Sequence, residues 1–146
     1  MGNDSHSVQS LAFSLLAGSA RIERKLDREL SNIQGISFSE YQILVALQSS
    51  HESTATRVGL ADAVGLTPSG VTRALKPLEK IGLVNTLKDA RDARRSLAKL
   101  TKAGERLVND ATVSVNSVLA GVDQLAGLTK SQRVQFSALL EPLSHV

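Results

Sequence analysis

The segment Gly65-Leu66-Thr67-Pro68 constrains the fold of this chain more than any other, because it marks a tight turn between two helical patterns. Gly65 can adopt the positive φ that ends a helix without steric cost. Thr67 is a favourable N-cap, and Pro68 suits the first position of the next helix. A short glycine-containing turn between two helices is typical of the helix-turn-helix motif. We therefore predict one helix around residues 58–64 and a second over residues 68–81.

The second predicted helix has one apolar face and one polar face. Val71, Ala74, Leu75 and Leu78 recur at helical spacing, which predicts that they are buried. The opposite face carries hydroxyl and cationic side chains and no acid: Ser69, Thr72, Arg73, Lys76 and Lys80. Such a face suits the major groove of DNA, which presents phosphates and base-edge acceptors. An ordinary solvated basic surface is the alternative interpretation of this helix alone.

Residues 83–87 and 96–100 predict two short strands, joined by a basic tip at residues 88–95. The tip contains four cations and two acids. An arginine at such a tip suits a narrow minor groove, which concentrates negative potential. We expect Asp92 to hold Arg91 or Arg94 through a bidentate pair; a surface salt-bridge cluster of little energetic value is the alternative. Together with the helix-turn-helix, this hairpin predicts a winged helix-turn-helix, a unit that binds DNA.

Three sequence patterns follow one another along this region. Leu-Glu-x-x-Gly-Leu-Val occupies residues 78–84, Asp-x-Arg residues 92–94, and Leu-Thr-x-x-Gly residues 100–104. In this order they resemble the MarR-type winged helix-turn-helix transcriptional regulators, to which Phe38–Leu44 is also similar. With the flanking helices, the resemblance covers nearly the whole chain. Pro77 departs from it, since many members carry a charged residue there; we expect this proline to bend the helix end without breaking it.

The resemblance implies a dimer whose recognition helices enter the major groove and whose wings enter the minor groove. The residues expected to contact DNA, or to orient a contact, are Thr67, Ser69, Thr72, Arg73, Lys76, Arg91, Asp92, Arg94 and Arg95. Arg57 is expected to add a phosphate contact. The family also often binds a small, commonly aromatic anion between the dimer helices and the winged unit, which lowers DNA affinity. The candidate lining is Phe13, Leu16, Arg21, Tyr41 and Leu44, with an ordinary place in the core as the alternative for each.

Charge is distributed unevenly along the chain. The net charge is +3, but residues 57–106 carry 11 lysines and arginines against 5 acids, whereas the remainder carries 6 against 9. A basic middle on an acidic scaffold is typical of a nucleic-acid-binding unit. With no tryptophan and one tyrosine, the chain lacks the stacking platforms that bind single strands.

Composition also argues against several other classes of protein. The chain has no cysteine, which excludes disulfides, thiolate zinc sites and a thiol switch. Its three histidines (His6, His51 and His145) are far apart, so we predict neither a metal site nor a cofactor. The sequence contains no recognisable nucleophile–base pair and no phosphate-binding glycine loop, so nothing in it predicts an enzyme. Without an apolar run of membrane-spanning length or a signal peptide, the expected location is cytoplasmic.

Long helices are predicted on both sides of the winged unit. Apolar residues recur at near-heptad spacing over residues 8–33 and again over residues 101–125, before a last helix that begins after a capping box at Thr129 and Gln132. Another capping box starts the helix near residue 40, with Ser37–Glu40 and Ser39–Gln42 as alternatives. Helices of about 25 residues exceed 30 Å, more than one small winged unit can cover. One interpretation of residues 8–33 is a helix that packs in a dimer. The alternative is an ordinary amphipathic helix that packs on the core of its own chain.

The predicted architecture is mainly α with a small β-hairpin wing (α+β). Residues 1–36 form an N-terminal dimerisation helix, 37–101 the DNA-binding winged helix-turn-helix, and 102–146 the C-terminal dimerisation helices. The predicted function is a homodimeric transcriptional regulator, acting as a repressor, that binds a pseudo-palindromic double-stranded operator and is released by a small ligand. The alternative is a winged-helix protein-interaction module without DNA binding. The sequence specifies neither the operator nor the effector.

Overall fold

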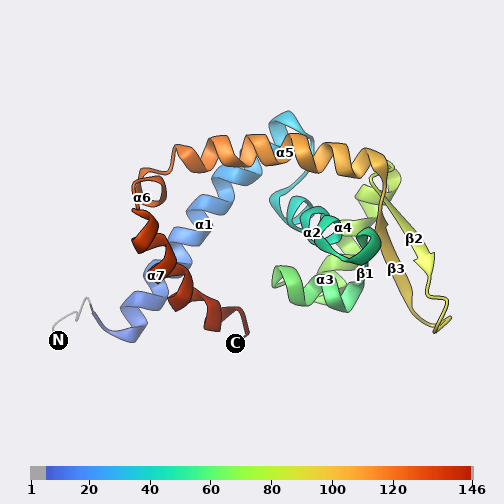
Figure 1. The fold of residues 1–146 in the computed structure, drawn as a ribbon, viewed down its shortest axis with the longest axis horizontal. Helices are drawn as coiled ribbons and strands as arrows, with labels where there is room; N and C mark the ends of the chain where they lie inside the picture. The colour runs from blue at the N-terminus through green and yellow to red at the C-terminus, as the bar shows by residue number, and fades with distance from the viewer. Residues whose placement is uncertain (1–5, 146) are drawn as a thin grey trace.

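The computed structural model describes residues 6–145 as a mainly helical chain with one small antiparallel sheet (Figure 1). The helices are α1 (Val8–Ile33), α2 (Phe38–Ser49), α3 (Arg57–Val64), α4 (Pro68–Lys80), α5 (Lys102–Ala120), α6 (Asp123–Ala126) and α7 (Lys130–Leu140). The strands are β1 (Thr54–Thr56), β2 (Val84–Lys88) and β3 (Ser96–Leu100), and two 3-10 turns are η1 (His51–Ser53) and η2 (Glu141–His145). The predicted fold class, a winged helix-turn-helix between long terminal helices, is confirmed.

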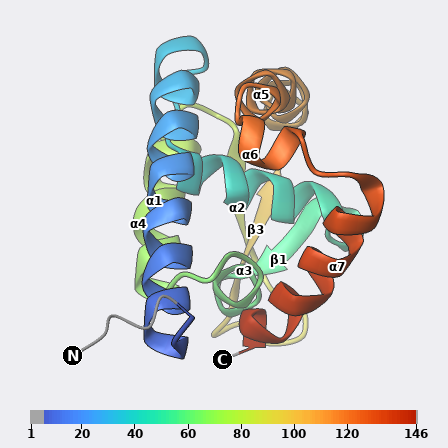
Figure 2. The ribbon, with the colours of Figure 1, turned by 90° about the vertical axis from the view of Figure 1, so that its left-hand side faces the viewer.

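Figure 1 shows α5 running between two groups of elements. The winged unit (α2, α3, α4 and the sheet) lies at the N-terminal end of α5, while α6 and α7 follow its C-terminal end. The C-terminal half of α1 packs beside α5, and its N-terminal half extends away from the winged unit. Figure 2 shows that α7 stands apart from α1. The core therefore lies within the winged unit and beneath the N-terminal half of α5, where Val108 and Ala111 are buried.

Side-chain caps set the start of the helices as the sequence predicted. Ser37 and Glu40 form the capping box of α2, which decides between the two alternatives and starts that helix at Phe38. Thr129 and Gln132 form the box that starts α7. At the end of α4, Gly82 adopts a φ of 79°, and its neighbour Leu83 donates its N–H to the Leu78 carbonyl at 2.9 Å. This Schellman-type ending turns the chain from α4 into the wing.

Two predictions of secondary structure were wrong. Only two strands were predicted, but Thr54–Thr56 form a third, β1, which pairs with β3, so the sheet has three strands in the order β1-β3-β2. The fifth helix was expected to reach residue 125, but α5 ends at Ala120 because Gly121, a poor helix former, caps it. A separate short helix, α6, follows after Val122 leaves the helical conformation. Pro77 lies inside α4, which continues through it to Lys80.

A close backbone contact fixes α5 to the root of the wing. Thr101 caps α5 by accepting a hydrogen bond from the Gly104 N–H, and its own hydroxyl donates to the Gly82 carbonyl at 2.7 Å. Its N–H donates to the Leu83 carbonyl at 3.0 Å. A Cβ at Gly104 would lie 2.3 Å from that same Leu83 oxygen and 2.6 Å from Cδ1 of Leu100. The Leu-Thr-x-x-Gly pattern thus has a physical cause: only glycine allows this approach.

Candidate nucleic-acid interface

Packing of α4 determines which of its side chains reach solvent. Val71, Leu75 and Leu78 are fully buried against the rest of the winged unit, as predicted, whereas Ala74, which was predicted with them, is half-buried. The helix begins at Pro68, where the Thr67 hydroxyl accepts a hydrogen bond from the Gly70 N–H at 3.0 Å. The residues expected to contact the major groove all lie on the outer side: Ser69, Arg73 and Lys76 are exposed and Thr72 is half-buried. Because its apolar side is buried, α4 presents one continuous face of hydroxyl and cationic side chains to solvent.

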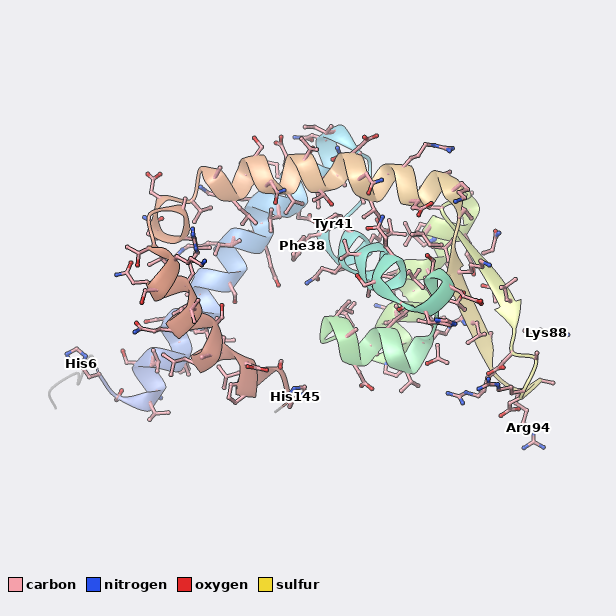
Figure 3. All side chains as sticks on the ribbon, viewed as in Figure 1. His6, Phe38, Tyr41, Lys88, Arg94 and His145 are labelled. Carbon is pink, nitrogen blue, oxygen red and sulfur yellow. The ribbon has the colours of Figure 1, made fainter. Side chains whose placement is uncertain are left out.

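Backbone hydrogen bonds order the tip of the wing. The Asp89 N–H donates to the Arg95 carbonyl and the Arg95 N–H donates to the Asp92 carbonyl, each at 3.0 Å. The two aspartates accept from backbone groups two residues ahead: Asp89 from the Arg91 N–H at 2.9 Å and Asp92 from the Arg94 N–H at 3.0 Å. Figure 3 shows Arg94 at the tip, with its side chain directed away from the body of the molecule.

The predicted pairing of Asp92 with an arginine side chain was wrong. Within residues 6–145, the described ion pairs join His51 to Glu52 and Lys102 to Glu105, and neither involves Asp92 or an arginine of the wing tip. Asp92 instead closes an Asx turn on the backbone of Arg94, because a short carboxylate reaches a nearby N–H without ordering a long side chain. The guanidinium groups of the wing tip therefore remain available for another anion.

Arg57 makes a contact that the sequence did not predict. It follows β1 directly, and its Nη1 donates to the hydroxyl of Ser96, the first residue of β3. Ser96 pairs with Lys88 in the last register position before the wing tip. Arg57 therefore joins the start of α3 to the base of the tip. The signal was hidden because it depends on the pairing of β1 with β3, and β1 itself was missed.

The five residues proposed to line an effector site do not form one cluster in the chain. Phe13 and Leu16 are exposed on the N-terminal half of α1, where Phe13 and Arg21 line the same shallow groove. Tyr41 and Leu44 lie in the core of the winged unit, and Leu44 has no exposed surface. Leu44 therefore occupies the core position that was the alternative for it.

Other kinds of site find little support in the described part of the chain. No group of three or more metal-ligating side chains occurs within residues 6–145, and Figure 3 shows His6 and His145 apart from each other, close to the two ends of the chain. Over the same residues, no helix is both long and apolar enough to cross a bilayer.

Comparison with known proteins connects this geometry to a family. A sequence model of the MarR family matches residues 34–95, which run from the start of the winged unit to the end of the wing tip. Among solved structures, the chain is similar to Sco3205 of Streptomyces coelicolor, a MarR family transcriptional regulator in complex with DNA. Their TM-score is 0.84 at 24% identity, over 93% of this chain and 84% of that one.

Two further structures of similar fold contain or concern small molecules. CouR of Rhodococcus jostii RHA1, bound to p-coumaroyl-CoA, has a TM-score of 0.83 at 24% identity over 96% of each chain. BpsR of Bordetella bronchiseptica, whose DNA binding is regulated by 6-hydroxynicotinic acid, has a TM-score of 0.82 at 20% identity over 100% of this chain and 99% of that one. The resemblance inferred from the sequence is confirmed as a match: residues 34–95 fit the MarR family model, and the chain has the same fold as these solved structures of MarR family transcriptional regulators.

Proposed function

We propose that the protein is a homodimeric transcriptional regulator that binds double-stranded DNA sequence-specifically and acts as a repressor. The observation that carries this proposal is the charge of the winged unit. Exposed cations on α4 and at the wing tip have no carboxylate partner within residues 6–145. A cationic helix face beside a cationic hairpin matches the major groove and the adjoining minor groove of one duplex.

Each part of the interface has a proposed role. On α4, Ser69, Thr72, Arg73 and Lys76 contact base edges and phosphates in the major groove, and Thr67 adds a phosphate contact at its N-terminus. At the wing, Arg91, Arg94 and Arg95 contact the minor groove or its phosphates. Asp92 orders the backbone of the wing turn and so fixes the position from which the Arg94 side chain extends. Residues 37–101 are the DNA-binding domain in this proposal.

Exposed apolar surface supports the homodimer. Every residue of α7 except Leu140 is exposed, and α7 contributes none to the core. Phe13 on α1 is 62% exposed, and Leu139 on α7 is 74% exposed. A helix of 11 residues is marginal in water unless an apolar face is buried. We propose that residues 1–36 and 102–146 of a second copy cover these faces, bringing two recognition helices to one side of a pseudo-palindromic operator.

Effector control is the remaining part of the proposal. CouR and BpsR are linked to p-coumaroyl-CoA and 6-hydroxynicotinic acid, both aromatic compounds that carry acidic groups. A ligand of that chemistry would find a cation and an aromatic ring together at Arg21 and Phe13. We propose that such a ligand binds near α1 and lowers DNA affinity in a cytoplasmic regulator that has no enzymatic activity.

Two arginine variants test the DNA-binding proposal. Arg94→Ala should weaken binding to every sequence and reduce the slope of log affinity against log salt by about 1, since one phosphate or groove contact is lost. Arg73→Ala should instead reduce sequence discrimination by about 1–3 kcal/mol if it reads a guanine. Both are measured by fluorescence anisotropy with labelled duplexes at several salt concentrations.

Arg106→Ala is the matched control for these variants. Arg106 is also exposed, but it lies on α5, at the root of the wing rather than its tip. It should leave both affinity and salt slope unchanged. If all three variants bind like the wild type, the proposed interface is wrong. If the wild type itself binds no duplex at low salt, a protein-interaction role replaces DNA binding.

A further inference from the structure

Three side-chain hydrogen bonds join α5 to α2 and to the C-cap of α1, and they flank the buried face of α5 on both sides. Gln34 Nε2 donates to the Ser114 hydroxyl at 2.9 Å, the Tyr41 hydroxyl lies 3.0 Å from the Thr112 hydroxyl, and Gln48 Nε2 donates to Asn109 Oδ1 at 3.2 Å. The three residues that precede α5 in sequence are seven positions apart (34, 41 and 48). Their partners on α5 follow in the reverse order (114, 112 and 109). We call this set of hydrogen bonds the polar seam; its members are Gln34, Tyr41, Gln48, Asn109, Thr112 and Ser114.

The seam is an unusual device for holding two helices together. Side-chain to side-chain bonds make up only about 10–15% of the hydrogen bonds in folded proteins. Apolar packing tolerates small slips between helices, but a hydrogen bond weakens steeply with distance and angle. Two bonds from α2 on one side of α5 and one from Gln34 on the other therefore select one register and one rotation of α5 against α1 and α2.

The central pair has a defined direction. The Thr112 hydroxyl donates its proton to the Val108 carbonyl, one turn earlier in α5, at 2.8 Å. Since a hydroxyl carries one proton, Thr112 must accept from Tyr41 rather than donate to it. Tyr41 is only 9% exposed, and its ring stacks on Phe38 with centroids 6.3 Å apart. Figure 3 shows Tyr41 next to Phe38, between α2 and α5. Without Thr112, this buried donor would lose its partner.

The consequence for DNA binding follows from the length of α5. The helix has 19 residues, which correspond to about 28 Å. A rotation of about 10° about its fixed N-terminal end would displace the other end by about 5 Å, more than the 3.4 Å rise of one base pair. The Thr101–Gly104 contact fixes one end of α5 to the wing. The polar seam is the second fixed point, and two fixed points define the angle between α5 and the winged unit.

We propose that the polar seam sets the distance between the two recognition helices of the dimer, and so selects the half-site spacing of the operator. This inference rests on the proposed function, because spacing exists only for a dimer on DNA. The seam residues are positioning residues: they act through α5 and are not part of the DNA-contacting face. Loosening the seam should widen the range of accepted spacings and leave the sequence preference of each half-site unchanged.

The test compares operators that differ only in the separation of their half-sites. Full-length wild type, Thr112→Val and Thr112→Ser are each titrated against duplexes whose half-sites are moved apart or together by one and two base pairs. Valine has nearly the shape of threonine but cannot accept the Tyr41 proton, whereas serine keeps the hydroxyl. A single half-site duplex measures the intrinsic contact, and analytical ultracentrifugation measures the dimer.

The wild type should prefer one spacing, and Thr112→Ser should keep that preference. Thr112→Val should reduce the preference on the order of two- to tenfold, as expected for one hydrogen bond, with unchanged single half-site affinity and an intact dimer. Identical spacing profiles for wild type and Thr112→Val would overturn the inference while leaving DNA binding established. A wild type that binds no duplex, or remains monomeric, would contradict the proposed function instead. Ser114→Ala provides a second variant of the seam if Thr112→Val fails to fold.

Discussion

Gly104→Ala is the perturbation whose effect the structure defines most sharply. The new methyl carbon would lie 2.3 Å from the Leu83 carbonyl oxygen and 2.6 Å from Cδ1 of Leu100. The leucine side chain can rotate, but the carbonyl belongs to the backbone at the root of the wing. It also accepts the Thr101 N–H, so its movement would weaken that hydrogen bond as well. The first turn of α5 must therefore move away from the sheet.

The magnitude is the difference between two terms. Overpacking a close contact costs about 1–3 kcal/mol. Alanine returns up to about 1 kcal/mol through its higher helix propensity. We expect a net loss of about 1–2 kcal/mol in the free energy of unfolding, or about 3–8 °C in Tm for a chain of this size. Thermal unfolding followed by circular dichroism measures this, at one fixed protein concentration because an oligomer's Tm depends on it.

Gly18→Ala is the matched control, since Gly18 lies inside α1 and a Cβ there meets nothing within 4 Å. It should raise the stability by about 0.5–1 kcal/mol. A loss of stability in Gly104→Ala and a gain in Gly18→Ala would show that the close contact at Gly104, and not the flexibility of glycine, determines the result. Equal stabilisation of both would refute the claim that Gly104 is required by close approach.

Two further predictions concern the wing and the exposed helices. Asp92→Asn should retain DNA affinity because the amide oxygen still accepts the Arg94 N–H, whereas Asp92→Ala should weaken it about two- to tenfold, the equivalent of one lost hydrogen bond; anisotropy titration would contradict this if both variants lost affinity equally. Leu139→Asp should raise the dimer dissociation constant at least tenfold, since it places a charge in a buried apolar contact. Val58→Asp, at an exposed apolar position on α3 outside the proposed dimerisation helices, should leave sedimentation unchanged, and equal dissociation by both would argue against α7 as the interface.

Local patterns predicted the helices of this fold well. The bounds of α1 and the start of α4 follow from apolar spacing and from caps such as Thr67, which act within one helical turn. Three of the four residues predicted for the buried stripe of α4 are buried and Ala74 is half-buried, because the period of the stripe is a property of the segment itself. The basic character of the wing was equally visible, since charge requires no knowledge of contacts.

The features that the sequence did not reveal all depend on contacts between distant segments. β1 has three residues and becomes a strand only because β3 lies beside it, so no period distinguishes it from a loop. The partner of Arg57 depends on that same pairing. Asp92 was wrongly paired because a backbone N–H two residues ahead competes with the arginine side chains. The polar seam joins residues 61 to 80 positions apart, beyond the reach of any local pattern.

The measurement that tests the central claim most directly is selection of DNA by the purified full-length protein. Random duplexes are incubated with the protein at two salt concentrations, and the bound fraction is sequenced. The proposal predicts enrichment of a pseudo-palindrome with half-sites about 10 base pairs apart, with stronger enrichment at the higher salt because non-specific binding falls first. Recovery of DNA without any enriched sequence, or no recovery even at low salt, would contradict a dimeric, sequence-specific regulator.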